Sequence, residues 1–313
     1  MVKPLKLILA GLLATSTLAM AMPTELNITY VKSPFNLQNI VMKERQMLEK
    51  AFEKDGVKVN WRVINSGAQQ AQALTSGSLD VSAVMNTASL LMAASSGAPI
   101  QAVNGVAHPE DIFALVAKPG LTLTLADLKG KTIVGPKGTV LHQLLVAALK
   151  KAGLTMADVN FVNMDPGAAL AAIMAGQADV GLLAANLIIK AQAAGSKVVT
   201  TAHGLVNPNL VMVARTGFMK EHPDALERVV KVEQEALRWI REHKDEALAI
   251  GAKEQGISVE DARKLYEGSH FYDQLTSADV EGLKADQAFL LENGMMTQPL
   301  DVKTLVWDKA LKK

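Results

Sequence analysis

The residues with the clearest potential for chemistry stand in a short pattern that occurs twice in the chain. In both copies, residues 73–81 and 172–180, a predicted helix ends at a glycine. Two spacer residues follow, and then Asp-Val, with the aspartates Asp80 and Asp179. A pair of carboxylates could serve acid–base chemistry. The same position also suits an aspartate that accepts nearby backbone N–H groups where a helix gives way to a strand. The spacing favours this structural role for both aspartates.

Other catalytic arrangements are missing from the sequence. The chain has no cysteine, which excludes a thiol nucleophile, a thiolate metal site and disulfide bonds. It contains no Gly-x-Ser-x-Gly segment, and its six histidines lack metal-ligand spacing. Residues 135–139 resemble a phosphate-binding loop but lack its Gly-Lys-Ser/Thr core. We therefore expect a binding protein rather than an enzyme, with no cofactor and no metal.

Polar and small residues follow the predicted strands at the point where each strand ends. In open α/β sheets, ligands bind beyond the carboxyl ends of the strands. Asn, Ser and Gly are also common turn formers, and for any single loop that explanation would suffice. Their recurrence at seven loops predicts a polar ligand cleft. The predicted ligand-binding residues in these loops are Phe35, Asn36, Gly67, Gln69, Asn86, Thr87, Gly138, Thr139, Asn186 and Asn209.

The elements that position these loops form two similar sets. Strands and helices alternate from residue 25 to residue 106, and the alternation restarts at residue 125. Such alternation is typical of βαβ units with parallel strands. The predicted fold is α/β, with two Rossmann-like lobes that enclose a ligand cleft. The apolar strands 112–118 and 209–215 are interpreted as two crossover strands between the lobes.

The ends of the chain complete the expected domain organisation. Lys3 and Lys6, the apolar run 7–20 and Ala19-Met20-Ala21 have the three-part pattern of a secretory signal peptide, residues 1–21. The alternative is a membrane anchor, but the run is shorter than the roughly 20 residues that a spanning helix needs. We expect lobe 1 at 22–115, lobe 2 at 116–211, and a helical return to lobe 1 at 212–313, including the helices 223–242, 245–253, 259–267 and 277–291.

Composition narrows the range of partners. The chain of 313 residues is 49% hydrophobic and 20% charged, with a net charge of +1, and shows no clustered basic surface for nucleic acid. Aromatic residues make up 4% of the chain, which counts against a sugar-binding cleft with stacking rings. Beyond the signal segment, no stretch is apolar enough for stable membrane insertion. We expect a monomer that binds a small molecule.

Three segments carry a resemblance to a known family. They are the two repeated segments and Leu125-Ala126-Asp127-Leu128-Lys129-Gly130, which leads into the loop 135–139. Over essentially the whole mature chain, the sequence resembles substrate-binding proteins of bacterial ABC importers, of the nitrate/sulfonate/taurine/thiamine-precursor type. This resemblance implies the type II periplasmic binding protein fold, a periplasmic location, hinge closure on the ligand, and delivery of that ligand to permease subunits.

The resemblance also suggests a class of ligand. In aliphatic-sulfonate binders a Lys-Gly-Ser-Ser-Ser-His-like loop matches residues 137–142, which adds His142 to the predicted binding residues, although two of the three hydroxyls are missing here. Asn86 and Asn186 stand where relatives often have an acidic residue. Their neutrality disfavours a ligand with an amine and leaves a neutral polar molecule or a small organic anion, such as an aliphatic sulfonate, which we expect. A fold-related enzyme of the thiamine-pyrimidine-synthase type and a periplasmic ligand sensor remain alternatives.

Overall fold

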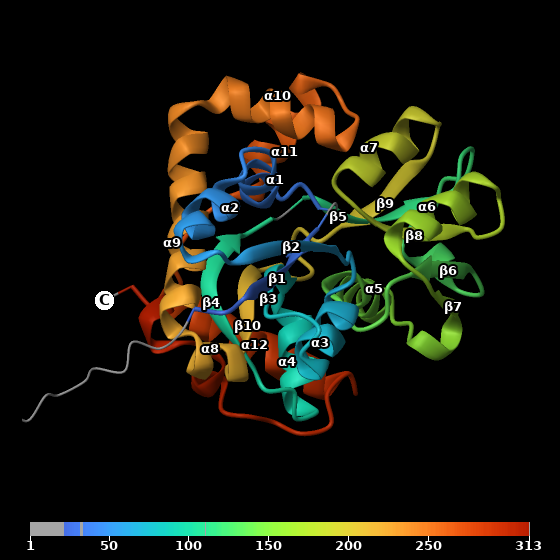
Figure 1. Cartoon of the computed structure of the whole chain (residues 1–313). Helices are drawn as coiled ribbons and strands as arrows, with labels where there is room; N and C mark the ends of the chain where they lie inside the picture. The colour runs from blue at the N-terminus through green and yellow to red at the C-terminus, as the bar shows by residue number, and fades with distance from the viewer. Residues whose placement is uncertain (1–21, 32–33, 110, 313) are drawn as a thin grey trace, which may run out of the picture.

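The structure is a computed structural model that describes residues 22–31, 34–109 and 111–312. The predicted signal peptide therefore lies outside the described residues. Two mixed sheets with flanking helices form two lobes (Figure 1). The lobe 1 sheet consists of β1 (Glu25–Tyr30), β2 (Lys58–Val63), β3 (Val81–Asn86), β4 (Ile100–Ala107) and β10 (Leu210–Arg215). The lobe 2 sheet consists of β5 (Phe113–Ala117), β6 (Thr132–Gly135), β7 (Asn160–Asn163), β8 (Val180–Ala184) and β9 (Lys197–Thr201).

The two sheets have equivalent strand orders, β2-β1-β3-β10-β4 and β7-β6-β8-β5-β9. In the lobe 1 sheet, β1 pairs in parallel with β2 and β3. In the lobe 2 sheet, β6 pairs in parallel with β7 and β8. The predicted crossover strands, β10 and β5, instead run antiparallel to both of their neighbours. The expectation of parallel pairing was thus wrong for these two strands. Each of them follows a connection that brings the chain in from the other sheet.

The helices cover the faces of both sheets. Those before the first crossover are α1 (Leu37–Glu44), α2 (Met47–Phe52), α3 (Gly67–Ser76) and α4 (Thr87–Ser95). Lobe 2 carries α5 (Val140–Lys151), α6 (Pro166–Met174) and α7 (Asn186–Ala193). The return to lobe 1 brings α8 (Thr216–Glu221), α9 (Pro223–Glu242), α10 (Lys244–Gln255), α11 (Val259–Ser269) and α12 (Ser277–Glu292). Helices α9 and α10 pack on α1, and α12 packs on α4. We propose from this packing that the segment 212–313 returns to lobe 1.

One predicted helix is interrupted in the structure. The expected helix 37–54 divides into α1 and α2, followed by a short 3-10 turn, Glu53–Asp55. Gln46 causes the break because it adopts a left-handed conformation with a φ of +53°, which few non-glycine residues adopt. The change in direction brings Leu48 and Phe52 fully into the core. Periodicity alone could not reveal this break, since the apolar spacing continues across it.

The expected lobe boundaries, after residues 115 and 211, fall inside β5 and β10. Strand β5 pairs only within the lobe 2 sheet and β10 only within the lobe 1 sheet. We therefore propose boundaries in the connections 108–112 and 202–209, where the chain passes from one sheet to the other. These two connections are the interlobe connections discussed below.

The repeated aspartates fasten strands together in both lobes. The Asp80 carboxylate accepts the backbone N–H of Asn27 in β1 at 2.8 Å and Nη2 of Arg215 in β10 at 2.7 Å. In lobe 2, Asp179 accepts the backbone N–H of Thr132 in β6 at 3.1 Å and Nζ of Lys118, directly after β5, at 2.8 Å. The structural role is confirmed. The partners lie on adjacent strands, however, and not within the helix-to-strand turn.

A buried acid in α9 gives the fold a dependence on pH. Glu233 is 1% exposed and accepts Nδ2 of Asn104 at 2.8 Å. Burial raises the pKa of Glu233 from 4.5 to about 8, against the opposing effect of the Asn104 hydrogen bond. Because the folded state holds this proton more tightly, the stabilisation is complete below the unfolded pKa. It is lost as the pH rises to the folded pKa.

We predict that the free energy of unfolding falls by about 1.4 kcal/mol per pH unit between pH 5 and pH 8 through Glu233 alone. Glu233→Gln should flatten this slope, and Glu235→Gln, partly exposed on the same helix, should leave it unchanged. Urea unfolding at several pH values measures the effect. Equal slopes for wild type and Glu233→Gln would contradict it.

Candidate functional site

A cavity lies where the two lobes meet, with a volume of about 50 Å³. It exceeds the roughly 10–15 Å³ that one water molecule needs but is far smaller than the roughly 300–1,000 Å³ of typical ligand pockets. A ligand with several carbon atoms would therefore enter only if the lobes move apart. The lobes are described here in a closed arrangement.

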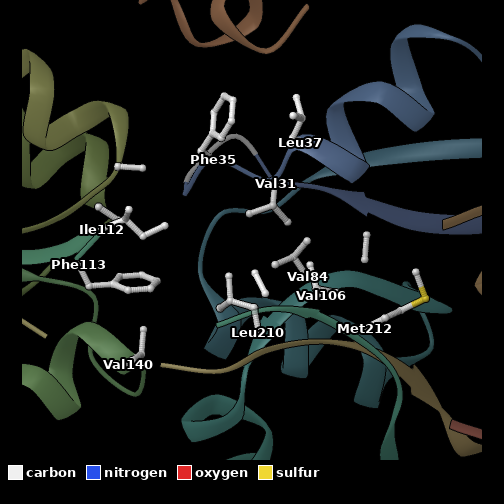
Figure 2. Close-up of a cluster of buried hydrophobic side chains, with 14 of the residues drawn as sticks. Val31, Phe35, Leu37, Val84, Val106, Ile112, Phe113, Val140, Leu210 and Met212 are labelled. Carbon is white, nitrogen blue, oxygen red and sulfur yellow. The ribbon is translucent and has the colours of Figure 1, made fainter. Parts of the chain in front are cut away.

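The cavity walls come from both lobes and are mostly apolar. Phe113 and Val140 of lobe 2 face Val31, Val84 and Leu210 of lobe 1 across the cavity (Figure 2). These side chains belong to one buried cluster that runs through both lobes. An apolar wall of this kind favours a ligand that carries hydrocarbon.

Four helices begin at the cavity. Gly67 starts α3, Asn86 precedes α4, Val140 starts α5 and Pro166 starts α6, and each of these residues lines the cavity. The first N–H groups of a helix have no partner within that helix, and the helix dipole makes this end positive. None of the described lining residues carries a charged side chain. The positive ends of the helix dipoles therefore favour an anion at the cavity.

Asn86 links the two lobes at this point. Its Oδ1 accepts the backbone N–H of Ser89 at 2.9 Å, which caps α4, and the backbone N–H of Val140 at 3.2 Å, at the start of α5. The hydroxyl of Ser89 donates to the carbonyl of Gly138 at 2.8 Å. Two hydrogen bonds from neighbouring residues of lobe 1 therefore hold the start of α5.

Among the predicted binding residues, Gly67, Asn86 and Thr139 line the cavity. Thr139 is 4% exposed, and its hydroxyl donates to the carbonyl of Pro136 at 3.0 Å. Gly138 has a φ of +71°, a conformation that favours glycine, and presents its carbonyl to Ser89. Contact of these four residues with a ligand remains a prediction.

His142 lies beside the cavity rather than in its lining. Its Nδ1 accepts the backbone N–H of Gly138 at 3.4 Å, and its ring stacks on Phe161. Burial, helped by the charge of Lys137, lowers the pKa of His142 to about 4. The ring is therefore neutral at pH 7, and it supports the loop without offering a positive charge to an anion.

Three predicted residues use their side chains in contacts within the protein. Gln69 donates to Asp165 across the lobes at 3.5 Å. Thr87 donates to Asp286 at 2.7 Å, and Asn209 bonds to Tyr272 and Asp279. None of the three lines the cavity. Contact of these side chains with a ligand remains a prediction.

The remaining three predicted residues, Phe35, Asn36 and Asn186, are buried at the starts of α1 and α7. The ring of Phe35 lies against Gly251 of α10, where an added Cβ would be 2.8 Å from it. Asn36 donates to the Val31 carbonyl at 3.3 Å. Asn186 is 7% exposed, and its Oδ1 has no hydrogen-bond partner among the described residues. It follows Ala185, which is held at a φ of +47°. All three also lie outside the cavity lining.

The predicted set of binding residues lacks the apolar lining and two polar lining residues, Asn65 and Gln70. Gln70 is 1% exposed, lines the cavity and accepts the Ser82 hydroxyl at 2.7 Å. The sequence pattern predicts its neighbour Gln69 as a binding residue instead, because a helix start does not indicate which of two adjacent side chains faces the cavity. Val31 directly follows β1, and Leu210 begins β10. These positions at strand ends could have indicated both residues as part of the cavity lining.

Fold and site together define a two-lobed α/β protein of the binding-protein class, with a cavity between the lobes. Residues 51–247 match the family model described as NMT1/THI5 like, and the chain belongs to this family. The chain is 26% identical over 309 residues to a "Putative aliphatic sulfonates-binding protein" of Escherichia coli (strain K12), with 97% of this chain and 96% of the relative covered.

Two further comparisons agree. The "Taurine-binding periplasmic protein" of the same strain is 31% identical over 188 residues, which cover 58% of each chain. The structure of the alkanesulfonate-binding protein SsuA from Xanthomonas axonopodis pv. citri bound to MOPS superposes with a TM-score of 0.81 at 22% identity. That match covers 92% of this chain and 99% of SsuA, so the two share their fold. No helix in the described part of the chain is long and apolar enough to cross a membrane.

The close approach of α3 to α4 generates a prediction. A Cβ on Gly67 would lie 2.5 Å from Ser89 Oγ and 2.8 Å from Asn86 Nδ2. Gly67→Ala should displace both side chains and release the Val140 amide. Its hydrogen exchange should accelerate by about tenfold or more, as expected from 1–3 kcal/mol of overpacking.

Gly167→Ala is the matched control for this exchange measurement. Gly167 also lies in the first turn of a helix at the cavity, and no atom would come within 4 Å of its added Cβ. An unchanged Val140 exchange rate in Gly67→Ala would show that Asn86 does not hold α5.

Proposed function

We propose that this protein captures a small organic anion with an uncharged, apolar tail, an aliphatic sulfonate above all, and delivers it to the permease of an ABC importer. The observation that carries this proposal is the meeting of four helix starts at a cavity with apolar walls. Helix N-termini stabilise an anionic headgroup, and the apolar walls suit a hydrocarbon tail. The names of the relatives, sulfonate and taurine binders, support a sulfonate headgroup.

The proposal concerns binding rather than catalysis. Among the described lining residues there is no Asp, Glu, Lys or His that could transfer a proton. The hydroxyl of Thr139 donates to a carbonyl and has no base as a partner. The lining therefore offers a ligand a complementary shape and helix dipoles, but no side chain that could react with it.

The site residues and the location are parts of the same proposal. We propose that Gly67, Asn86, Gly138 and Thr139 surround the anionic group, and that the N-terminal segment directs export to the periplasm with cleavage after Ala21. The mass of the exported chain would test the cleavage site. Co-purification with permease subunits would separate transport from the sensor alternative.

The cavity predicts a preference that calorimetry can measure. Ethanesulfonate should bind the purified protein, refolded from denaturant to remove any retained ligand. Taurine, which differs only by an ammonium group, should bind at least about tenfold more weakly, because no described lining carboxylate compensates for desolvating the ammonium. Taurine affinity equal to that of ethanesulfonate would contradict the neutral-tail proposal. A lack of response to sulfonates, carboxylates and nitrate would contradict an anion site.

A second prediction concerns the hydroxyl of Thr139. Thr139→Ala should weaken ethanesulfonate binding by about 1–2 kcal/mol, because the hydroxyl would turn from the Pro136 carbonyl to the anion on binding, and the variant cannot form that hydrogen bond. Thr139→Ser retains the hydroxyl and serves as the control, with affinity near wild type. Titration calorimetry on both variants measures the difference. Unchanged affinity in Thr139→Ala would move the anion site away from the start of α5.

A further inference from the structure

Helix α12 is fastened at its start to both interlobe connections. Asp279, 5% exposed, caps the helix by accepting the backbone N–H and the hydroxyl of Thr276. Its Oδ1 accepts Nδ2 of Asn209 at 3.1 Å and lies 3.1 Å from Nε2 of His108. His108 and Asn209 belong to the first and the second connection. One carboxylate therefore fixes the start of α12 at the point where the lobes are joined.

Two turns further on, α12 contacts the other lobe through Asp286. Oδ1 of Asp286 accepts Nε2 of Gln143, on α5 of lobe 2, at 3.1 Å. Oδ2 accepts the hydroxyl of Thr87, on α4 of lobe 1, at 2.7 Å. Burial raises the pKa of Asp286, whereas the hydrogen bonds from Thr87 and Gln143 lower it. A carboxylate in such a position needs its donors, since an unpaired buried charge is costly.

The same two helices share a second contact of a different kind. Lys150 of α5 and Glu292 of α12 form an ion pair at 2.6 Å, with 54% and 63% of the side chains exposed. Exposed ion pairs contribute little because water screens them. Of these two contacts, the bond between Gln143 and Asp286 is the one that water does not screen.

We propose that Asp286 and Gln143 form a latch that holds the lobes closed, and that the latch sets ligand affinity without touching the ligand. Neither residue lines the cavity. When the lobes separate, Gln143 leaves Asp286, which then takes its donors from water. The free-energy difference between these two states biases closure, and ligand affinity changes by the same factor as the closed population. This inference rests on the proposed function, because it assumes a cleft that closes on a ligand.

The latch gives Thr87 and Asn209 a role in positioning. Thr87 holds the second oxygen of Asp286, and Asn209 holds the start of the same helix. Both were predicted from sequence as ligand-binding residues, Thr87 directly after β3 and Asn209 directly before β10. In the proposed latch they act instead through Asp286 and Asp279.

Reversal of the donor and the acceptor tests the latch. Gln143→Glu places a second carboxylate against Asp286, and the repulsion should open the lobes and weaken ethanesulfonate binding by about tenfold or more. In Gln143→Glu combined with Asp286→Asn, the new amide can donate to Glu at position 143 and accept from Thr87. This double variant should return to within about threefold of wild type. Glu292→Gln, which removes the exposed ion pair between the same helices, should change affinity less than about twofold.

A second readout needs no ligand. Since the chain has no cysteine, dyes can be attached at Lys54→Cys and Gln177→Cys, exposed positions on lobe 1 and lobe 2. Energy transfer between the dyes should fall in Gln143→Glu and recover in the double variant. If Gln143→Glu does not fold, Gln143→Met removes the donor without adding charge and should shift the transfer in the same direction. Energy transfer can be measured even if ethanesulfonate does not bind the wild-type protein. Failure of the latch is therefore distinguishable from failure of the proposed function.

Two results would overturn the latch. One is energy transfer that does not change in Gln143→Glu or Gln143→Met, because the helices would then stay in contact as the cleft opens. The other is that Gln143→Glu lowers thermal stability and that the double variant restores neither the affinity nor the energy transfer. That outcome would assign Gln143 a purely structural role in α5.

Discussion

The amide oxygen of Asn86 is the constraint on which the closed cleft depends. It accepts one N–H from α4 of its own lobe and one from α5 of the other lobe. Because a carbonyl oxygen has two lone pairs, a single side chain can satisfy the starts of two helices at once. The same contact directs both helix starts toward the cavity. An aspartate here could accept the same bonds, but its negative charge would oppose an anion.

The neutrality of Asn86 extends to the rest of the site. The positive end of each helix dipole is a partial charge fixed in the backbone, so the cavity can attract an anion without a lysine or an arginine. The one titratable side chain of the predicted set, His142, is neutral at pH 7 because burial lowers its pKa to about 4. Anion recognition that depends on neutral groups should vary little with pH near neutrality.

The internal repeat explains how the lobes come to face each other. Each sheet has an aspartate directly before its central strand, Asp80 before β3 and Asp179 before β8, that fastens the parallel and the antiparallel neighbour of that strand. The same pattern produces the same strand order in both sheets. The loops that follow the repeats therefore occupy equivalent places in the two lobes. The lobes differ in their additions, since α9 to α12 return to lobe 1, and only α12 carries the proposed latch.

The sequence by itself determined the alternation of strands and helices, the repeat and the structural role of its aspartates. The alternation and the repeat depend on local periodicity, whereas the partners of the aspartates lie on other strands, 47 to 135 residues away. It also indicated Gly67, Asn86 and Thr139, which line the cavity, because helix starts after strands are recognisable locally. Tertiary structure alone decided that Gln46 breaks a helix, that Gln70 rather than Gln69 faces the cavity, and that Thr87 and Asn209 bond to α12. Those outcomes depend on partners that are distant in sequence, up to 199 residues apart for Thr87 and Asp286, and no local pattern encodes which distant group will be adjacent.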